Sequence, residues 1–521
     1  MFTFFQLWQP PLSAPPRQQP CRRRAIALLV MPLLLALTLI PAPSWASSIE
    51  PYLDRTQAQI QEFTLDNGMK FIVLERHEAP IISFMTYADA GGANEPPDKT
   101  GVAHFLEHLA FKGTPRIGTK NYEAEAPLLQ RLDELHEQIR QAQAAGEEAQ
   151  ARELQEEFRA VQQQASEYVI QNEFGQIVEQ YGGVGLNATT SADATRYFYS
   201  FPANKLELWM SLESERFLEP VFREFYEEQE VILEERRLGT DNSAIGSLVE
   251  EFLLTAFAVH PYRQPVIGHE ADIRNLTPQD TREFYETYYV PNNLTVAIVG
   301  DVELSQVQEL AQIYFGRYEP GPTPPDVTEV EPPQRDTREV EVRFPSQPWY
   351  LEGYHRPART HPDNATYELL VALLSDGRTS RLYQSLVEQQ QIALTAQGLN
   401  GFPGDKFPNL VLFYALTAPN HSLEEVQTAL RQEIEQIKQQ PVSAEDLERV
   451  KTQAKARLVR SLNSNSGMAS LLAEYQAKTG DWRNLFREIE AIEAVTANDI
   501  RRVARQTFRR ENRTLGKLLP S

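Results

Sequence analysis

Residues Thr100–Thr114 read TGVAHFLEHLAFKGT, and the interpretation of the whole chain begins from this stretch. His104, Glu107 and His108 stand at positions i, i+3 and i+4, so on a helix their side chains share one face. Two neutral imidazoles suit Zn²⁺, and a catalytic zinc site needs a third protein ligand and an open position for water. The carboxylate of Glu107 is then placed to accept a proton from that water rather than to bind the metal.

The alternative interpretation is a pair of helical histidines with an incidental glutamate on a wet surface. The other side chains around the motif are mostly apolar: Val102, Ala103, Phe105, Leu106, Leu109 and Phe111. The three polar side chains would therefore lie against a buried wall, where ionisable groups are rare unless they are paired or bound to a metal. The pattern favours a site for one zinc ion per chain.

The first 46 residues resemble an export signal with a long leader. Arg22–Arg24 provide the positive region, Ala25–Ile40 the apolar region, and Ser44-Trp45-Ala46 the small residues of a cleavage site. The alternative is a permanent membrane anchor, but the apolar run contains Pro32 and is short for a membrane span. We expect cleavage near Ala46 and export to the periplasm or another extracytoplasmic compartment, with membrane contact only through an uncleaved leader.

The amino-acid composition limits which metal ligands and which partners are expected. Cys21 is the only cysteine, so the mature protein would have no disulfide and would bind metal through His and carboxylate. The chain has 521 residues, enough for two to four domains, and a net charge of −22. Removal of the four leader arginines brings that charge to about −26 (−22 − 4), which argues against nucleic acid as a partner. A surface this acidic is also compatible with cationic substrates.

Local patterns predict alternating strands and helices. Phe63–Leu74 reads as a hairpin around Asn67-Gly68, and Ile81–Ala90 and Gly182–Pro202 have the composition of strands. Leucines at helical spacing over Glu123–Val169 predict an antiparallel helical hairpin, either a simple insertion or an arm that docks a partner. Acidic Phe225–Leu238 is expected to form a partly buried helix.

The second part of the chain repeats the first. A helix predicted over Asn275–Tyr289, with Thr277 as its N-cap, recurs 219 residues later at Thr496. A proline-rich segment, Glu319–Arg335, separates the two parts, and no HxxEH sequence follows it. The sequence therefore predicts an α+β protein with two related domains, of which only the first carries a metal site.

HFLEH within GVAHFLEHLAFKGT, the later VILEE at residues 231–235, the duplication and the proline-rich hinge resemble the M16 peptidases. These inverted-zincin metalloendopeptidases include the mitochondrial processing peptidase and pitrilysin. The resemblance implies two homologous domains, each a mostly antiparallel sheet packed with helices, that together form half of a clamshell. We expect a signal peptide at 1–46, a peptidase domain at 47–318 with an insertion at 123–170, a linker at 319–338 and a metal-free domain at 339–521.

The resemblance also assigns roles to residues. It implies that His104, His108 and Glu235 bind zinc and that Glu107 is the general base. Glu235 lies 127 residues after His108 (235 − 108), and removal of the helical insertion restores the spacing of the family. Glu228 matches a glutamate that supports the site. The substrate-binding edge strand corresponds to Gly185, Leu186, Asn187 and Ala188, to which a peptide would add as a further strand.

One departure from the family concerns the second domain. Self-sufficient members carry an Arg and a Tyr seven residues apart there, and this chain has Val387 and Leu394 instead. Arg378, Arg381 and Tyr383 are close but out of register. The resemblance thus implies a metal-bearing subunit that takes the Arg/Tyr pair from an M16-like partner, or a homodimer. Two other readings stay open: a non-catalytic scaffold subunit of an M16-like complex, and hydrolysis of a bond other than a peptide.

Overall fold

The computed structural model describes residues 50–521, so the predicted leader at 1–46 lies outside the described part. The first described helix is α2 (Glu50–Gln59), and the chain from Ile60 to Ser521 forms one compact unit. Among the described helices, none is long and apolar enough to cross a bilayer.

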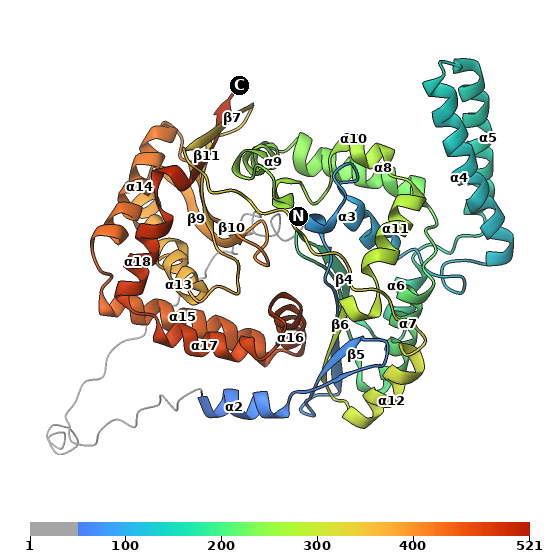
Figure 1. Cartoon of the computed structure of the whole chain (residues 1–521), viewed down its shortest axis with the longest axis horizontal. Helices are drawn as coiled ribbons and strands as arrows, with labels where there is room; N and C mark the ends of the chain where they lie inside the picture. The colour runs from blue at the N-terminus through green and yellow to red at the C-terminus, as the bar shows by residue number, and fades with distance from the viewer. Residues whose placement is uncertain (1–49) are drawn as a thin grey trace, which may run out of the picture. The chain divides into compact units, whose positions relative to one another are not determined.

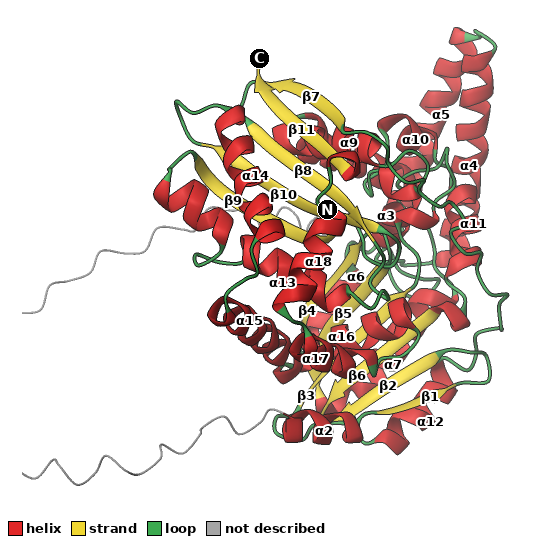
Figure 2. Cartoon of the chain, turned by 60° about the vertical axis from the view of Figure 1, so that its left-hand side comes forward, coloured by secondary structure: helices red, strands yellow, loops and turns green. Residues whose placement is uncertain are grey.

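A six-stranded sheet organises the first half, in the order β1-β2-β6-β3-β5-β4 (Figure 2). Its strands are β1 (Gln61–Thr64), β2 (Lys70–Glu75), β3 (Ile81–Ala88), β4 (Val184–Thr190), β5 (Thr195–Pro202) and β6 (Leu294–Gly300). β2 and β6 are parallel, and the other neighbours are antiparallel. The predicted hairpin at Asn67-Gly68 is confirmed, with Gly68 at a φ of +94° that suits glycine. β4 forms one outer edge of this sheet.

The second sheet repeats this order without a counterpart of β1. It runs β7-β11-β8-β10-β9, and again one pair, β7 with β11, is parallel. Its strands are β7 (Arg338–Phe344), β8 (Trp349–Arg356), β9 (Ala393–Phe402), β10 (Asn409–Thr417) and β11 (Arg513–Pro520). The predicted fold class, α+β with two homologous and mostly antiparallel sheets, is confirmed. Within the described chain, residues 315–337 between the two sheets form neither helix nor strand.

The offset between the halves changes along the chain. β2 and β3 begin 268 residues before β7 and β8 (338 − 70 and 349 − 81), whereas β6 begins 219 residues before β11 (513 − 294). The first half therefore contains 49 more residues (268 − 219) between β3 and β6 than the second half has between β8 and β11. This excess has about the length of the helical hairpin that the sequence predicts as an insertion.

Helices cover both sheets. In the first half they are α3 (Val102–Leu109), α6 (Glu173–Gln180), α7 (Leu206–Leu218), α8 (Phe225–Arg236), α9 (Ala244–Ala256), α10 (Glu270–Asn275), α11 (Pro278–Tyr288) and α12 (Leu304–Tyr314). In the second they are α13 (Asn364–Ser375), α14 (Leu423–Gln439), α15 (Ala444–Asn463), α16 (Asn465–Thr479), α17 (Asn484–Ala494) and α18 (Ala497–Thr507).

One helix prediction needs correction. The single helix expected over Asn275–Tyr289 is interrupted, because α10 ends at Asn275 and α11 begins at Pro278. Proline has no backbone N–H to continue a helix but is well suited to its first position. Thr277 is the N-cap of α11, as predicted, and Thr496 caps α18 in the same way.

The helical hairpin consists of α4 (Tyr122–Ala144) and α5 (Glu148–Ser166), which lie side by side and extend away from the first sheet (Figure 1). Its own apolar seam contains buried Leu132, Leu135, Val161 and Ala165. Gly146 turns the chain between the helices with a φ of +75°.

The two halves exchange helices. α9 of the first half packs on β7 and β11 of the second sheet, and α16 of the second half packs on β3 and β6 of the first (Figures 1 and 2). Phe252 of α9 is fully buried against glycines: a Cβ at Gly353 would lie 2.6 Å from its ring, and one at Gly516 would lie 3.0 Å away. Gly353 on β8 and Gly516 on β11 therefore leave the space that the side chain of Phe252 occupies.

Charged groups also join the halves. The turn between β4 and β5 carries Asp193, whose Oδ2 accepts the backbone N–H groups of Asp405 at 2.9 Å and Lys406 at 3.2 Å. Lys478 of α16 places Nζ 3.1 Å from the same oxygen and also pairs with Asp405, which Arg359 contacts at 2.9 Å. Each of these groups has an opposite charge nearby, as buried charges require.

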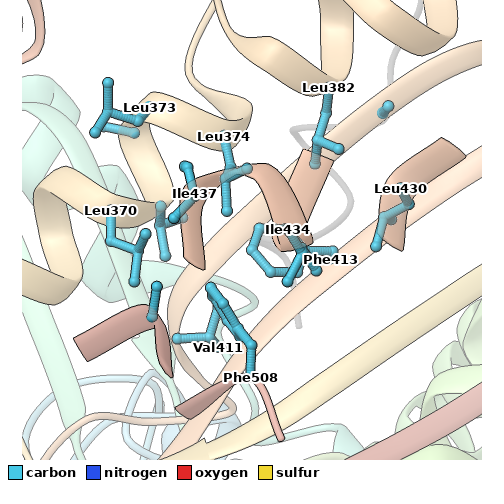
Figure 3. Packing of buried hydrophobic residues seen from close by; sticks show 14 of the residues in the cluster. Leu370, Leu373, Leu374, Leu382, Val411, Phe413, Leu430, Ile434, Ile437 and Phe508 are labelled. Atoms are coloured by element: carbon cyan, nitrogen blue, oxygen red, sulfur yellow. The ribbon is translucent and has the colours of Figure 1, made fainter. Parts of the chain in front are cut away.

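The second half has a large apolar core of its own. Side chains from α13, α14 and β10 interlock there, as Figure 3 shows for Leu370, Leu374, Phe413 and Ile434. Leu447 and Ala454 of α15 belong to the same cluster.

Candidate metal centre

Helix α3 presents the HxxEH motif as the sequence predicts. Gly101 precedes the helix with a φ of +91°, and the carboxylate of Glu95 accepts the N–H groups of Gly101 and Ala103, each at 2.9 Å. These contacts satisfy N–H groups that a helix start leaves without partners. The opposite face of α3 is apolar and buried, with Val102, Phe105 and Leu109 fully enclosed.

Helix α8 brings the third candidate ligand to the two histidines. Nε2 of His108 lies 3.7 Å from Oε2 of Glu235, and Nε2 of His104 lies 3.9 Å from the same oxygen. One ligand atom from each of the three residues lies within 4.8 Å of the other two. Among residues 50–521, these three form the one such group of His, Cys, Asp or Glu side chains. Glu234, the residue before Glu235, pairs with Arg237 on the surface.

The residues present fit a zinc ion. Bonds of 2.0–2.1 Å in a tetrahedral site place ligand atoms roughly 3.3 Å apart, so a small contraction of the group would suffice. Burial, helped by the adjacent His108, holds the pKa of His104 well below its usual value, which leaves a neutral imidazole suited to bind metal. Burial also raises the pKa of Glu235, and the nearby His108 only partly opposes that shift.

Glu228 supports the second histidine. Its Oε2 lies 3.1 Å from Nδ1 of His108, which leaves Nε2 of that ring directed at the candidate site. Lys112 places Nζ 2.5 Å from the other oxygen of Glu228 and 3.0 Å from Glu224. Burial opposes ionisation of Glu228, but the hydrogen bonds with His108 and Lys112 prevail and lower its pKa. Lys112 was not predicted, although it stands four residues after His108 on the next turn of the quoted stretch.

The carboxylate of Glu107 is hydrogen-bonded to the first sheet. Its Oε2 accepts a hydrogen bond of 2.6 Å from the hydroxyl of Thr190, the last residue of β4. Burial raises the pKa of Glu107, and the Thr190 hydrogen bond opposes that shift. Sequence reasoning missed Thr190, because no local pattern indicates which strand hydroxyl meets a helix 83 residues earlier.

The four residues proposed to bind substrate lie on β4. Val184 and Asn187 pair with Ser200 and Phe198, so two residues of β4 oppose one of β5 in a β-bulge at Gly185-Leu186. Gly185 has a φ of +69° there, and nothing lies within 4 Å of its missing side chain. Oδ1 of Asn187 accepts the N–H of Ala188 at 2.9 Å, and α3 packs beside this strand.

Val387 and Leu394, which stand where the family resemblance implies Arg and Tyr, lie in different surroundings. Val387 packs against the core of the second half, whereas Leu394 on β9 is 53% exposed. Neither side chain can donate a hydrogen bond. Arg378 is exposed, and Arg381 and Tyr383 are half-buried.

An ion pair at the base of the helical hairpin was not predicted. Arg223 and Glu125 are both buried, and Nε of Arg223 lies 2.9 Å from Oε1 of the carboxylate. The other guanidinium hydrogens reach the second oxygen of Glu125 and three carbonyls in the loop after α3, those of Lys112, Thr114 and Ile117. Arg223 lies two residues before α8 begins at Phe225, so its contacts connect the hairpin and the loop after α3 to the start of α8. A cavity of about 330 Å³ lies beside this pair, and His104, His108 and Glu235 are not among its lining residues.

Comparison with known proteins bears out the family resemblance. The family model "Insulinase (Peptidase family M16)" matches residues 71–129, and "Peptidase M16 inactive domain" matches residues 275–454. The zinc protease PqqE of Helicobacter pylori is 30% identical over 475 residues, which cover 88% of this chain and 93% of that protein. The probable mitochondrial-processing peptidase subunit beta of Arabidopsis thaliana is 22% identical over 455 residues, 85% of this chain and 75% of that protein.

A solved structure extends the likeness to the fold. The crystal structure of a protease from Helicobacter pylori has a TM-score of 0.75 and 29% sequence identity to this chain. The match covers 88% of this chain and 99% of that one. The resemblance of the HxxEH region and of the duplicated architecture is thereby confirmed. The chain belongs to the M16 peptidase family, in which its relatives include named zinc proteases.

Proposed function

We propose that this protein is a zinc-dependent endopeptidase that hydrolyses peptides or unfolded polypeptide segments. The observation that carries the proposal is the convergence of His104, His108 and Glu235, contributed by two separate helices, with Glu107 between the two histidines on α3. A chance cluster of surface acids would not place one buried and one half-buried imidazole opposite the same carboxylate oxygen.

Each of these residues has a separate role in the proposed reaction. His104, His108 and Glu235 would hold one Zn²⁺, and Glu228 would keep His108 in the tautomer that offers Nε2. When bound, the ion supplies Lewis acidity, which polarises the scissile carbonyl and makes water more acidic. Glu107 accepts the proton of the attacking water and then delivers it to the leaving amine.

The substrate would bind as an extended strand along the open edge of β4, at Gly185, Leu186, Asn187 and Ala188. An edge strand has unpaired backbone groups that a peptide in strand conformation can pair with. The side chain of Asn187 accepts a hydrogen bond from the N–H of Ala188, and a bound peptide would replace that contact. A folded protein cannot offer such a strand, which is why unfolded segments are the favoured substrates.

The chain would act with a partner. Val387 and Leu394 replace the Arg/Tyr pair that the family resemblance implies, so we propose that an M16-like subunit supplies these groups in a heterodimer, or a second copy in a homodimer. The relative from Arabidopsis thaliana is itself named as a subunit. We further propose a peptidase domain at 47–318, a linker at 319–338, a metal-free domain at 339–521, and export after cleavage of residues 1–46.

The test is cleavage of an unstructured, fluorescence-quenched peptide by the mature protein, alone and with a co-expressed M16-like chain that lacks HxxEH. Activity that needs the second chain supports the heterodimer, whereas full activity of the purified chain alone contradicts it. Metal analysis runs in parallel and should find about one zinc per chain.

A non-catalytic scaffold is the second candidate. The observation that favours it is the apolar character of Val387 and Leu394, since neither can bind a carbonyl oxygen. Zinc binding without peptide hydrolysis in either assay would support this candidate instead.

A further inference from the structure

The hydrogen bond between Thr190 and Glu107 links the candidate base to the strand proposed to bind substrate. The histidines on either side of Glu107 direct Nε2 toward Glu235, whereas Oε2 of Glu107 lies 2.6 Å from Oγ1 of Thr190. Thr190 ends β4, the strand that contains Gly185–Ala188. The base is therefore held from the sheet side, independently of the metal ligands.

The hydroxyl of Thr190 is itself held in place. Thr190 is 6% exposed and pairs with fully buried Thr195 across β4 and β5. Oγ1 of Thr195 donates to the carbonyl of Ala90 at 3.1 Å and lies 3.4 Å from Oγ1 of Thr190. Because each hydroxyl has one hydrogen, Thr195 satisfies the carbonyl and Thr190 is free to donate to the carboxylate. The branched side chain of threonine also restricts its rotation.

This arrangement gives the two carboxylate oxygens different tasks. Oε2 accepts the threonine hydroxyl, so Oε1 is the oxygen left to take the proton of the attacking water. A carboxylate on two rotatable bonds beyond Cβ would otherwise sample several orientations, and general-base catalysis depends on the distance between base and proton.

We propose that Thr190 is a positioning residue that orients the carboxylate of Glu107 for proton transfer and couples that orientation to the substrate-binding strand. The proposal rests on the proposed peptidase function for its catalytic meaning. Its structural part, that the Thr190 hydroxyl fixes the Glu107 side chain, stands on its own.

The kinetic test compares Thr190→Val with Thr190→Ser. Valine keeps the size and branching of threonine but cannot donate, so kcat should fall about 10- to 100-fold, within the range for an impaired general base. KM and zinc content should stay within about twofold, because neither peptide pairing nor the metal ligands change. Serine restores the donor, and Thr190→Ser should recover most of kcat. Equal losses in both variants would indicate a packing effect and overturn the proposal.

A second measurement does not depend on turnover. Crystal structures of the zinc-bound variants should show the Glu107 carboxylate displaced or in several conformers in Thr190→Val and ordered in Thr190→Ser. His104, His108 and Glu235 should keep their positions in both. An unmoved Glu107 in Thr190→Val overturns the proposal even if no peptide is cleaved. Absence of activity in the wild-type protein would instead count against the proposed function, so the two failures are distinguishable.

Discussion

Helices α8 and α15 occupy corresponding places in the two halves of the chain, but α8 carries acidic side chains where α15 carries apolar ones. In the first half, α8 carries Glu228 and Glu235 toward the histidines of α3. In the second, the positions 219 residues later on α15 are Leu447 and Ala454, both buried in the apolar core. α13, the first helix after β8, contributes Leu370, Leu373 and Leu374 to that core.

The difference shows that this fold does not need the metal group for its stability. The second half reaches the same strand order with leucine and alanine, which bury apolar surface without any ionisable side chain. The first half keeps charged groups at the corresponding places, where each must be paired to be tolerated. The charged groups of the first half occupy places that the second half fills with apolar side chains. Because such groups weaken packing, they are expected to serve function.

The largest effect should come from changes to the motif that distinguishes the first half. Glu107→Gln should lower peptide cleavage by about 10²- to 10⁴-fold, because the amide cannot accept the proton, while zinc stays bound. His108→Ala should lose the zinc itself, since a ligand is removed. The measurements are turnover of the quenched peptide and metal content after dialysis.

The matched control lies in the second half. His361→Ala removes a histidine that contacts Asp363 far along the chain from the motif, and both activity and zinc should be unchanged. Cleavage by Glu107→Gln at the wild-type rate would contradict the assignment of the base.

A smaller but still large effect should follow from weakening the helix exchange. Phe252→Ala on α9 leaves a cavity against Gly353 and Gly516 of the second sheet, and should reduce the free energy of unfolding by about 3–5 kcal/mol. Both halves should still unfold in one transition, observed by circular dichroism and tryptophan fluorescence in urea. Ile313→Ala, on the exposed surface of α12, should change stability by less than about 0.5 kcal/mol. Two separate transitions in the wild-type protein would show that the halves fold independently.

Substitutions that place a carboxylate on α15 and remove one from α8 test the comparison directly. Ala454→Glu introduces a carboxylate into an apolar core and should cost about 3 kcal/mol or somewhat more at pH 8. The cost should be smaller at pH 5, where the new side chain can fold in its protonated form. Glu235→Ala, measured with a chelator present, should destabilise the fold less than Ala454→Glu, because it removes a carboxylate whose ionisation burial already opposes. Equal destabilisation by the two substitutions would contradict the interpretation of the halves.

The smallest change in stability should come from a substitution among the charged groups that join the halves. Burial opposes ionisation of Asp405, but Lys478 and Arg359 lower its pKa from the usual 3.8 to about 2. A carboxyl whose pKa is lower in the folded state stabilises the fold above its unfolded pKa and loses that contribution as the pH falls. Asp405→Asn should therefore be less stable than the wild type at pH 6, and the difference should shrink between about pH 4 and pH 2. Thermal unfolding across this range measures it, and a difference that grows in acid would refute the assignment.

Much of this architecture was predictable because it rests on local signals. Asn67-Gly68 predicts a hairpin, Thr277 and Thr496 mark helix starts, and the i, i+3, i+4 spacing of His104, Glu107 and His108 requires only a helix. Glu235 could be assigned only through the family resemblance, because a long insertion separates it from the histidines.

Contacts between distant segments could not be predicted in the same way. Thr190, Arg223 and Glu125 act through partners that only the folded chain brings together. The bulge at Gly185 depends on how β4 pairs with β5, and the exchange of α9 and α16 depends on the placement of both sheets. None of these contacts leaves a periodic pattern in the sequence.

The exchange of α9 and α16 has a consequence for the ancestry and assembly of the chain. Two copies of a single repeat could cover each other's sheets by donating one helix apiece, as in a symmetric domain-swapped dimer. Covalent joining through a segment such as 315–337, which forms neither helix nor strand, would preserve that arrangement in one polypeptide. In the vocabulary of quaternary structure, the chain resembles a tethered dimer whose subunits have diverged. A cut in the tether should accordingly leave two fragments that stay together and elute as a single particle.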